Sequence, residues 1–478
     1  MATSTINQNL SKEAENQSNP ASNRSSTQGL TGDQAKSSSE TPVNSSTPPS
    51  SGPKKDSVRI TTQEETKKSK KLLIPVIIGL LVLAGLAAYF FLINKPNYVD
   101  PFGKSDEANG NTDNPVPSTK NEGFENPING VFYSNEEAAK FKDRKPVAIM
   151  VNNYVEARPS SGLSKADIVF EAVAEAGITR LMPIFYSQSP ETVGSIRSAR
   201  YYFAELATPY SPHYIHWGAA HVPACQKEPA TSPTYCPPVG GKVETNPLVD
   251  AYDRIVELGL PNLDGGNYSC DQPTCAFGRD PKKVGKMPLE HTAFVRFPLI
   301  FQKAKEVRPE ANWHVFQPIT PKWTFKDDEA KDKRGTIGST TPITYDYSNY
   351  PGFNVSWKYN PETNLYQRSQ GGVVQKDFEN NQDLNAKVVI IRFTDQESAN
   401  DKKAHLIHKI VGTNKALIFQ DGKVTQGTWS RTTHDENDVY KDAQGKEIAF
   451  DRGQIWVQLV PTGNIVNYSE SATPAPAN

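Results

Sequence analysis

The chain has 478 residues, with 52 lysines and arginines against 53 acidic residues, so its formal net charge is −1. A balance this close to neutral excludes a global field that would attract nucleic acid or anionic lipid. Once the polar ends are set aside, roughly 340 residues remain, which is enough for two domains of ordinary size.

The first segment, residues 1–71, is rich in Ser, Thr, Asn, Gln and Pro and ends in a cluster of lysines. It contains few large apolar residues, and such a segment cannot bury enough surface to offset the entropy lost on ordering. We predict a disordered tail.

An uncharged apolar run, residues 72–93, comes next. At about 1.5 Å per residue, a helix of this length crosses a hydrocarbon core of roughly 30 Å. Because cationic flanks stay in the cytoplasm, the preceding lysines place residues 1–71 inside and the rest outside. A cleaved signal peptide fits less well, since the run is long and no small-x-small cleavage site follows it. The sequence predicts a single-pass anchor in the cell membrane, with a cytoplasmic N-terminus and extracytoplasmic domains.

Two further polar segments flank the folded part that we expect. Residues 94–130 are rich in Pro, Gly and Asn, which predicts a flexible spacer. The end of the chain, residues 469–478, has a similar polar composition and is predicted to be a second disordered tail.

All four cysteines follow the anchor, and disulfides persist in the oxidising space expected there. Sequence proximity favours the pairs Cys225–Cys236 and Cys270–Cys275 among three possible connectivities. A zinc site is one alternative, because the spacing of the second pair can bind a metal, and free thiols are another. The spacing of the first pair is loose for a zinc knuckle. We predict two disulfides, no metal and no cofactor.

Residues 131–318 are predicted to form a mixed α/β domain. The segment 166–176 is ambiguous, because its alternation fits a strand whereas its Ala and Glu content fits a helix. Ser198 is expected to cap a helix from 199 to about 207. Short apolar runs predict strands at residues 145–152, 178–187, 192–196 and 214–217.

Residues 319–468 are predicted to form a β-rich, sandwich-like domain, which makes the whole an α+β protein. The pair Asp421-Gly422 is the clearest hairpin turn. Short segments rich in aromatic and β-branched residues predict strands at residues 323–326, 343–347, 354–359, 366–369, 387–393, 416–419, 427–430 and 455–460.

Two groups in this second part have alternative roles. An aromatic platform for sugar rings is possible, although such residues more often belong to a core; the group is Trp357, Tyr359, Trp429 and Trp456. The i,i+3 spacing of His405 and His408 could bind a metal, but we expect a solvated loop there.

Several motifs carry a family resemblance: Asn152-Asn153, Arg158-Pro159, Ser161-Gly162-Leu163, residues 166–169, residues 177–180, GSIRSAR at residues 194–200, and Glu290-His291-Thr292. On these motifs the chain resembles the YerB-like family of bacterial envelope proteins, and residues 345–468 resemble the second domain of that family. The resemblance covers most of residues 140–468. It implies an envelope location and no settled reaction. Family members are often lipoproteins anchored through a cysteine. Since no cysteine precedes Cys225 here, the anchor would be the helix.

An anion-binding pocket is the hypothesis that the arginines of the first domain suggest. A guanidinium presents a rigid fork of donors to a carboxylate or phosphate, and a helix N-terminus adds backbone donors. We predict a ligand site made of Arg158, Glu171, Arg180, Arg197, Ser198, Arg200 and His291. The alternative is that these arginines pair with the acidic residues Asp167, Glu171, Glu175 and Glu205.

No catalytic residue is identifiable, and the motifs of the common hydrolases, metalloproteases and phosphate-binding loops are missing from the sequence. The function that we expect is binding of cell-wall polymer or envelope proteins, with the membrane contacted through one helix and no nucleic acid bound. The alternative is a hydrolase or transferase acting on cell-wall polymer through Arg, Glu and His side chains. The histidines weighed as a base are His213, His216, His221 and His291, with Glu290 or Glu171 as the acid. A receptor ranks last, because the cytoplasmic tail has no visible signalling domain.

Overall fold

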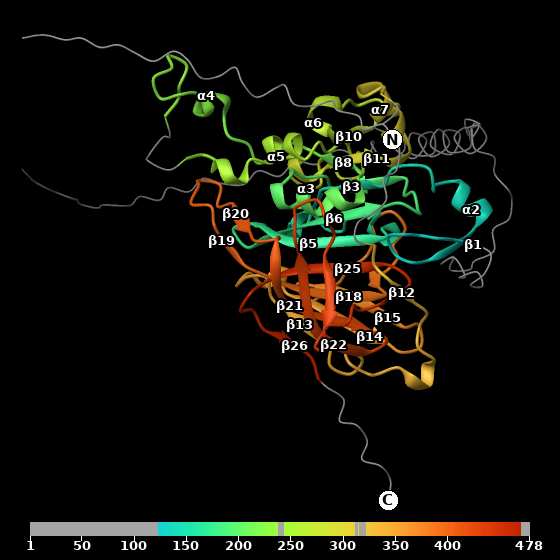
Figure 1. The fold of residues 1–478 in the computed structure, drawn as a ribbon. Helices are drawn as coiled ribbons and strands as arrows, with labels where there is room; N and C mark the ends of the chain where they lie inside the picture. The colour runs from blue at the N-terminus through green and yellow to red at the C-terminus, as the bar shows by residue number, and fades with distance from the viewer. Residues whose placement is uncertain (1–122, 238–242, 311–313, 315–321, 470–478) are drawn as a thin grey trace, which may run out of the picture. The chain divides into compact units, whose positions relative to one another are not determined.

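The computed structural model describes residues 123–237, 243–310, 314 and 322–469 (Figure 1). These residues all belong to a compact unit that begins at Gly110. The predicted anchor and cytoplasmic tail lie outside the described residues, as do most of the spacer and nearly all of the C-terminal tail. Within the described ranges, none of the helices combines the length and the apolar content that a membrane crossing requires.

Eleven strands form one mixed sheet, and they come from both halves of the folded part. They are β3 (Val147–Ile149), β4 (Val151–Asn152), β5 (Ile168–Glu175), β6 (Ile178–Phe185), β8 (His213–His216), β9 (Asn262–Asp264), β18 (Val388–Thr394), β21 (Gly412–Gln420), β22 (Lys423–Arg431), β23 (Val439–Asp442) and β25 (Ile455–Pro461). The order is β23-β22-β21-β18-β25-β5-β6-β3-β8-β9, with β4 paired to β6. Strand β25 runs parallel to both of its neighbours, β18 and β5 (Figure 1). The two predicted domains therefore contribute strands to a common sheet.

The ambiguous segment 166–176 forms strand β5, and the two cores of the protein explain why. Phe170 and Ala172 enter one core, whereas Val169 and Val173 enter the other. Successive side chains of a strand point to opposite faces, so a strand covered on both faces reads as a continuous apolar run. Burial on both faces therefore decides for a strand, although the Ala and Glu content of the segment also fits a helix.

The other strands form smaller sheets. A six-stranded sheet contains β13 (Ile343–Tyr345), β14 (Val355–Asn360), β15 (Leu365–Gln370), β16 (Val373–Val374), β17 (Asn385–Ala386) and β26 (Val466–Asn467), and a three-stranded sheet contains β7 (Thr192–Gly194), β10 (Phe277–Arg279) and β11 (Ala293–Arg296). The strand pairs are β1 (Gly123–Glu125) with β2 (Phe132–Ser134), β12 (Phe325–Lys326) with β24 (Phe450–Asp451), and β19 (Gln396–Ser398) with β20 (Leu406–His408). The six-stranded sheet packs on the large sheet, where the Trp357 and Trp456 rings meet edge to face at 5.4 Å.

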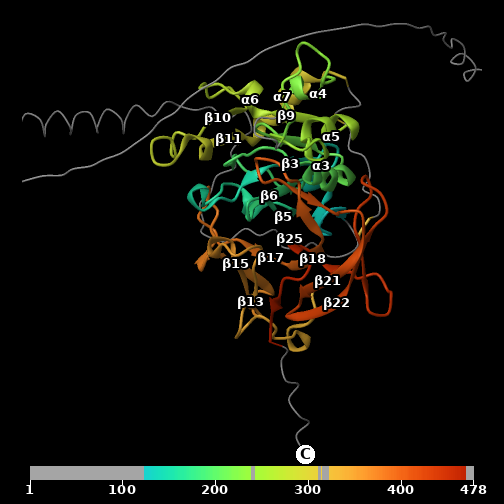
Figure 2. The same cartoon turned by 90° about the vertical axis from the view of Figure 1, so that its left-hand side faces the viewer.

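The helices are short. They are α2 (Asn135–Ala139), α3 (Tyr201–Ala207), α4 (Ala224–Lys227), α5 (Ala251–Glu257), α6 (Gly265–Tyr268) and α7 (Ile300–Val307). Helices α3 and α5 contact each other beside the large sheet (Figure 2). The described part is thus a mixed α/β fold dominated by sheets, and each predicted strand region contains a strand.

The prediction that Ser198 caps a helix beginning at 199 is wrong. Helix α3 starts at Tyr201, and its N-cap residue is Arg200, which makes no side-chain cap. The reason is tertiary, because the Ala199 amide donates to the Gly218 carbonyl (2.9 Å) and Ala199 forms a β-bridge with Ala219. Extended pairing therefore continues through Ala199.

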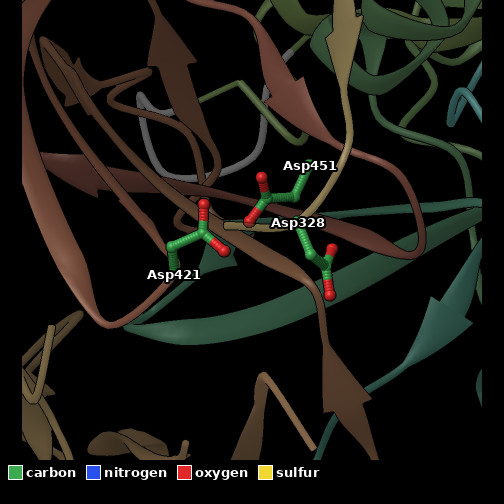
Figure 3. A group of neighbouring side chains, drawn as sticks. All are labelled: Asp328, Asp421 and Asp451. Carbon is green, nitrogen blue, oxygen red and sulfur yellow. The ribbon is translucent and has the colours of Figure 1, made fainter. Parts of the chain in front are cut away.

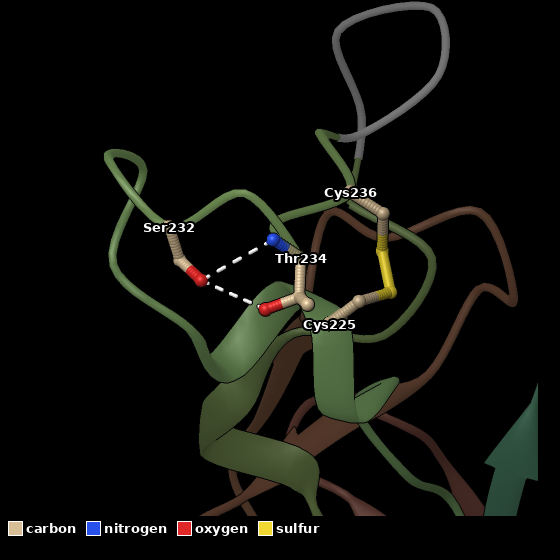
Figure 4. The surroundings of a disulfide bond; sticks show 4 residues. All are labelled: Cys225, Ser232, Thr234 and Cys236. Atoms are coloured by element: carbon tan, nitrogen blue, oxygen red, sulfur yellow. Dashed lines mark hydrogen bonds between the residues drawn. A yellow bond between two sulfur atoms is a disulfide. The ribbon is translucent and has the colours of Figure 1, made fainter.

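Both predicted disulfides are present. Cys225 and Cys236 lie 5.2 Å apart at Cα and close the loop that follows α4 (Figure 4). Within that loop the Ser232 and Thr234 hydroxyls lie 2.7 Å apart (Figure 4). Cys270 and Cys275 form the second bond, so no cysteine thiol is left for the zinc alternative.

The hairpin at Asp421-Gly422 is confirmed, since β21 and β22 pair through Gln420 and Lys423 on either side of it. Asp421 and Gly422 have φ values of 52° and 65°, the left-handed pair that a two-residue hairpin requires. Aspartate tolerates this conformation better than most residues, and glycine adopts it without strain.

The aromatic group of the second part belongs to the core rather than to a platform. Trp357 and Trp456 have no exposed surface, and Tyr359 and Trp429 are 2% exposed. The expectation of a solvated loop at His405 and His408 is wrong.

Both histidines are buried, because β20 packs beside β5. The His405 ring lies 2.8 Å from the Asp401 carboxylate, and His408 Nε2 lies 2.9 Å from the Val173 carbonyl. The His408 ring also packs against Tyr202 in a tilted arrangement, with ring centroids 4.1 Å apart.

Candidate functional site

A hollow of about 310 Å³ brings together residues that are far apart in the sequence. It is lined by Asn152, Tyr154, Glu156, Glu175, Ile178, Arg180, Arg197, Pro288, Glu290 and His291. Its volume lies at the lower end of the range of about 300–1,000 Å³ typical of small-ligand sites. Three of the predicted ligand residues, Arg180, Arg197 and His291, are among its lining.

The large sheet and the segment after β7 set the positions of the polar groups. Asn152 at the end of β4 lies opposite Arg180 in β6. The Arg197 amide donates to the Met150 carbonyl (2.9 Å), and the Arg197 carbonyl accepts from the Trp217 amide (3.1 Å). Arg197 is therefore held from two sides through its backbone, which leaves its side chain unconstrained by the sheet.

Glu175 forms ion pairs with two of the arginines. Its carboxylate oxygens lie 2.5 Å from Arg180 and 2.7 Å from Arg200. Burial alone would raise the pKa of Glu175, but the two guanidinium groups lower it to about 2. Arg180 also donates to the Ser198 carbonyl. Arg180 and Arg200 therefore form ion pairs with an acidic residue, as the alternative interpretation of the arginines predicted.

Arg197 differs from these two arginines. In the described ranges its guanidinium has no hydrogen-bond or ion-pair partner, and the side chain is only partly buried. Its charge is close enough to His291 to contribute, after burial, to a lowered pKa of that ring. A cation without a partner in a hollow is a group that an anionic ligand would satisfy.

Neighbouring groups fix the tautomer of His291. Asn152 Oδ1 accepts from the Tyr154 amide (3.0 Å), so its Nδ2 is the atom that faces His291 Nδ1 at 2.8 Å. Because Nδ1 accepts this bond, the neutral ring carries its proton on Nε2. The Tyr154 ring stacks on His291 with centroids 5.4 Å apart, which holds the plane of the imidazole. His291 therefore offers an N–H donor.

The other predicted ligand residues do not line the hollow. Arg158 donates to the Asn153 and Gly352 carbonyls (both 2.8 Å), so its role is structural. Glu171 is fully buried and pairs with Arg368 at 2.7 Å. Ser198 contributes its carbonyl to Arg180, and Arg200 reaches the site only through Glu175.

Sequence reasoning missed three lining residues, Tyr154, Glu156 and Pro288. None of them carries a local signal for binding, since they reach the hollow only through the pairing of distant segments. Asn152, Ile178 and Glu290 did stand out in the sequence, because each lies in a motif that carries the family resemblance.

A second polar cluster contains Asp328, Asp421 and Asp451, whose carboxylate oxygens lie within 4.8 Å of one another (Figure 3). The Lys326 ammonium lies 2.5 Å from Asp421 and also contacts Asp451, so a side-chain cation already lies between the two buried carboxylates. Asp328 pairs with Lys387 at 2.6 Å.

The two buried carboxyls of this cluster titrate differently. Burial raises the pKa of Asp451 to about 7 against the pull of Lys326. Burial also acts on Asp421, but hydrogen bonds from Lys326 and Asn364 hold the pKa of that carboxyl below its usual range. We interpret the cluster as an ion-pair network that joins β12, β24 and the β21–β22 turn.

Comparisons with known proteins agree with these observations. The family model "Protein of unknown function (DUF3048) N-terminal domain" matches residues 133–229, and the model of the corresponding C-terminal domain matches residues 343–457. The chain is 29% identical over 331 residues to "Putative lipoprotein YerB" of Bacillus subtilis (strain 168), covering 67% of this chain and 83% of the relative.

A solved structure, "Crystal structure of YerB protein from Bacillus subtilis", is similar to this fold with a TM-score of 0.56 and 26% identity. The match covers 73% of this chain and all of the other. The two family models, the relative and the solved structure all point to one group, and the chain is similar to the YerB-like family in both of its matched domains.

Proposed function

We propose that this protein is a membrane-anchored, extracytoplasmic envelope factor that binds an anionic group of a cell-wall ligand in the hollow beside Arg197. The observation that carries this proposal is that the Arg197 guanidinium, to which the described residues offer no partner, lines the same hollow as His291, whose neutral ring has its proton on Nε2. Two donors of this kind, one of them charged, match the acceptor atoms of a carboxylate or phosphate.

The envelope location rests on separate observations. The lysines that precede the apolar run favour an outside position for the folded part. Two disulfides are typical of an oxidising compartment. The Bacillus subtilis relative carries the name "Putative lipoprotein YerB".

The hydrogen bonding of His291 in the hollow favours binding over catalysis. A general base needs a nitrogen without a proton that faces the substrate. In His291 the unprotonated nitrogen, Nδ1, already accepts from Asn152. The partner that orients the ring is thus an amide and not a carboxylate, so the ring is arranged as a donor.

Co-sedimentation of the full chain, in detergent, with purified peptidoglycan tests the proposal. We expect Arg197→Gln to weaken retention by about tenfold or more, the size of one charge-assisted hydrogen bond. Lys441→Gln, which removes the same charge from an exposed position in strand β23, is the matched control and should bind as the wild type does. Equal retention of Arg197→Gln and wild type would contradict the proposed site, and release of soluble wall fragments would contradict a purely binding role.

A further inference from the structure

The hollow around Arg197 also contains unpaired negative charge. Glu156 and Glu290 line it, both are exposed, and neither has a hydrogen-bond or ion-pair partner among the residues that the structure describes. They differ in this from Glu175, whose two oxygens are taken by Arg180 and Arg200. One hollow therefore presents an unpaired cation and two unpaired carboxylates.

These opposite charges come from different segments of the chain. Arg197 follows β7 in an extended segment, whereas Glu156 lies in the loop after β4 and Glu290 lies in the short turn Leu289–His291. Since His291 follows Glu290 directly, the N–H donor of its ring and the carboxylate of its neighbour line the same hollow. A ligand that satisfies only Arg197 and His291 would leave both carboxylates without a partner.

From this arrangement we infer that the hollow recognises a zwitterion, a small ligand with both a carboxylate and a free ammonium group, such as an amino acid or a short peptide. The carboxylate contacts Arg197 and the Nε2–H of His291, and the ammonium lies at Glu156 and Glu290. This inference rests on the proposed function, because it identifies the class of ligand that the same site binds.

Charge and size both favour this class over a polyanion. Two like charges about 8 Å apart repel by about 2 kcal/mol at an effective dielectric constant of about 20, so a diphosphate would be opposed by the two glutamates. A volume of about 310 Å³ equals roughly ten water molecules in the liquid. That space accommodates one or two amino-acid residues.

Calorimetric titration of the full chain in detergent tests the inference with four probes: glycylglycine, N-acetylglycylglycine, glycylglycinamide and inorganic pyrophosphate. Glycylglycine is chosen because it is achiral. We expect it to bind, and we expect loss of either terminal charge to weaken binding by about tenfold or more. Equal binding of glycylglycine and its N-acetyl form, or a preference for pyrophosphate, would contradict recognition of a zwitterion. Either result would remain compatible with the proposed anion site. Failure of all four probes, together with wall binding that does not depend on Arg197, would overturn both.

Variants separate the two halves of the site. In the double variant Glu156→Gln/Glu290→Gln we expect glycylglycine to bind no better than its N-acetyl form, whereas Arg197→Gln should lose both carboxylate probes. Glu228→Gln, an exposed glutamate in the first disulfide loop, is the matched control and should keep the discrimination. Because Glu156 and Glu290 are exposed, their removal should leave the melting temperature unchanged. Discrimination that persists in a folded double variant would contradict the inference.

Discussion

Arg180 and Arg197 are the same residue type in one hollow, yet their side chains have different surroundings. Arg180 donates to Glu175 and to the Ser198 carbonyl, whereas the part of the chain that the structure describes offers no partner to the Arg197 side chain. Both arginines were equally plausible ligands from the sequence. The position of Glu175 at the end of β5 decides between them.

Replacement of Glu175 by glutamine should destabilise the protein, because two arginines would lose a shared carboxylate. The side chain is 23% exposed, so we expect a loss of roughly 2–4 kcal/mol. The pKa of Glu175 is lowered to about 2, so its contribution is present above pH 4.5 and lost as the pH falls through 2. Thermal melting at pH 7 and pH 3 checks this, and a difference between variant and wild type that is equally large at both pH values would contradict it.

The raised pKa of Asp451 predicts that stability depends on pH in the opposite direction. Its pKa is raised from 3.8 to about 7 in the folded protein, so the native state holds a proton that the unfolded chain releases. The stability that this provides is fully present below pH 3.8 and is lost as the pH rises through 7. At about 1.4 kcal/mol per pKa unit, the change amounts to several kcal/mol.

Asp451→Asn introduces a neutral side chain that can still accept a hydrogen bond from Lys326. The variant should show a flatter dependence of stability on pH in this range. We expect the variant to be more stable than wild type at pH 8 and of similar stability at pH 4. Asp328→Asn, which alters the more exposed member of the cluster, is the control and should keep the wild-type slope. Parallel profiles for wild type and Asp451→Asn would show that this carboxyl does not titrate in the range.

Among the secondary-structure elements, β5 connects the two halves of the described part through polar as well as apolar contacts. Glu171 in β5 pairs with Arg368 in β15, and both side chains have at most 1% of their surface exposed. The Arg368 guanidinium also lies 4.7 Å from the Trp456 ring centroid. One buried ion pair thus joins the large sheet to the six-stranded sheet.

Arg368→Met should cost about 3–5 kcal/mol of stability, because it leaves the Glu171 carboxylate buried without its cation. The double variant Glu171→Gln/Arg368→Met removes the charge and should recover much of that loss. Denaturant unfolding of the single and double variants measures the coupling between the two side chains. Additive effects would mean that the ion pair contributes nothing beyond its separate halves.

For the described part as a whole, the decisive feature is that β25 lies between β18 and β5. Residues 131–318 and 319–468 were predicted as separate domains, and this division stays a prediction. A strand edge as apolar as that of β5 is a ready template for aggregation when its neighbour is missing.

We therefore expect residues 110–318 expressed alone to aggregate or to remain protease-sensitive, since β5 would lose β25 and Glu171 would lose Arg368. Co-expression with residues 319–478 should restore a soluble, protease-resistant complex of the two fragments. Size-exclusion chromatography and limited proteolysis check both outcomes. A soluble and cooperatively folded N-terminal fragment would show that the division into domains holds despite the common sheet.

The sequence by itself determined the local features of this protein. Apolar runs at residues 145–152 and 178–187 placed strands, Asp421-Gly422 placed a hairpin, and the spacing of the cysteines placed two short-range disulfides. Each of these depends on residues that are neighbours along the chain, so periodicity, turn conformation and loop length are sufficient.

Only the tertiary structure decided the start of α3, the buried state of His405 and the partners of the arginines. Ala199 stays extended because Gly218 pairs with it. The described residues offer Arg197 no partner, because Glu175 pairs with two other arginines. Such outcomes depend on which distant strands meet, and burial and pairing between them override local propensity. For this reason the sequence could indicate a group of arginines, whereas the fold decided which of them pair with Glu175.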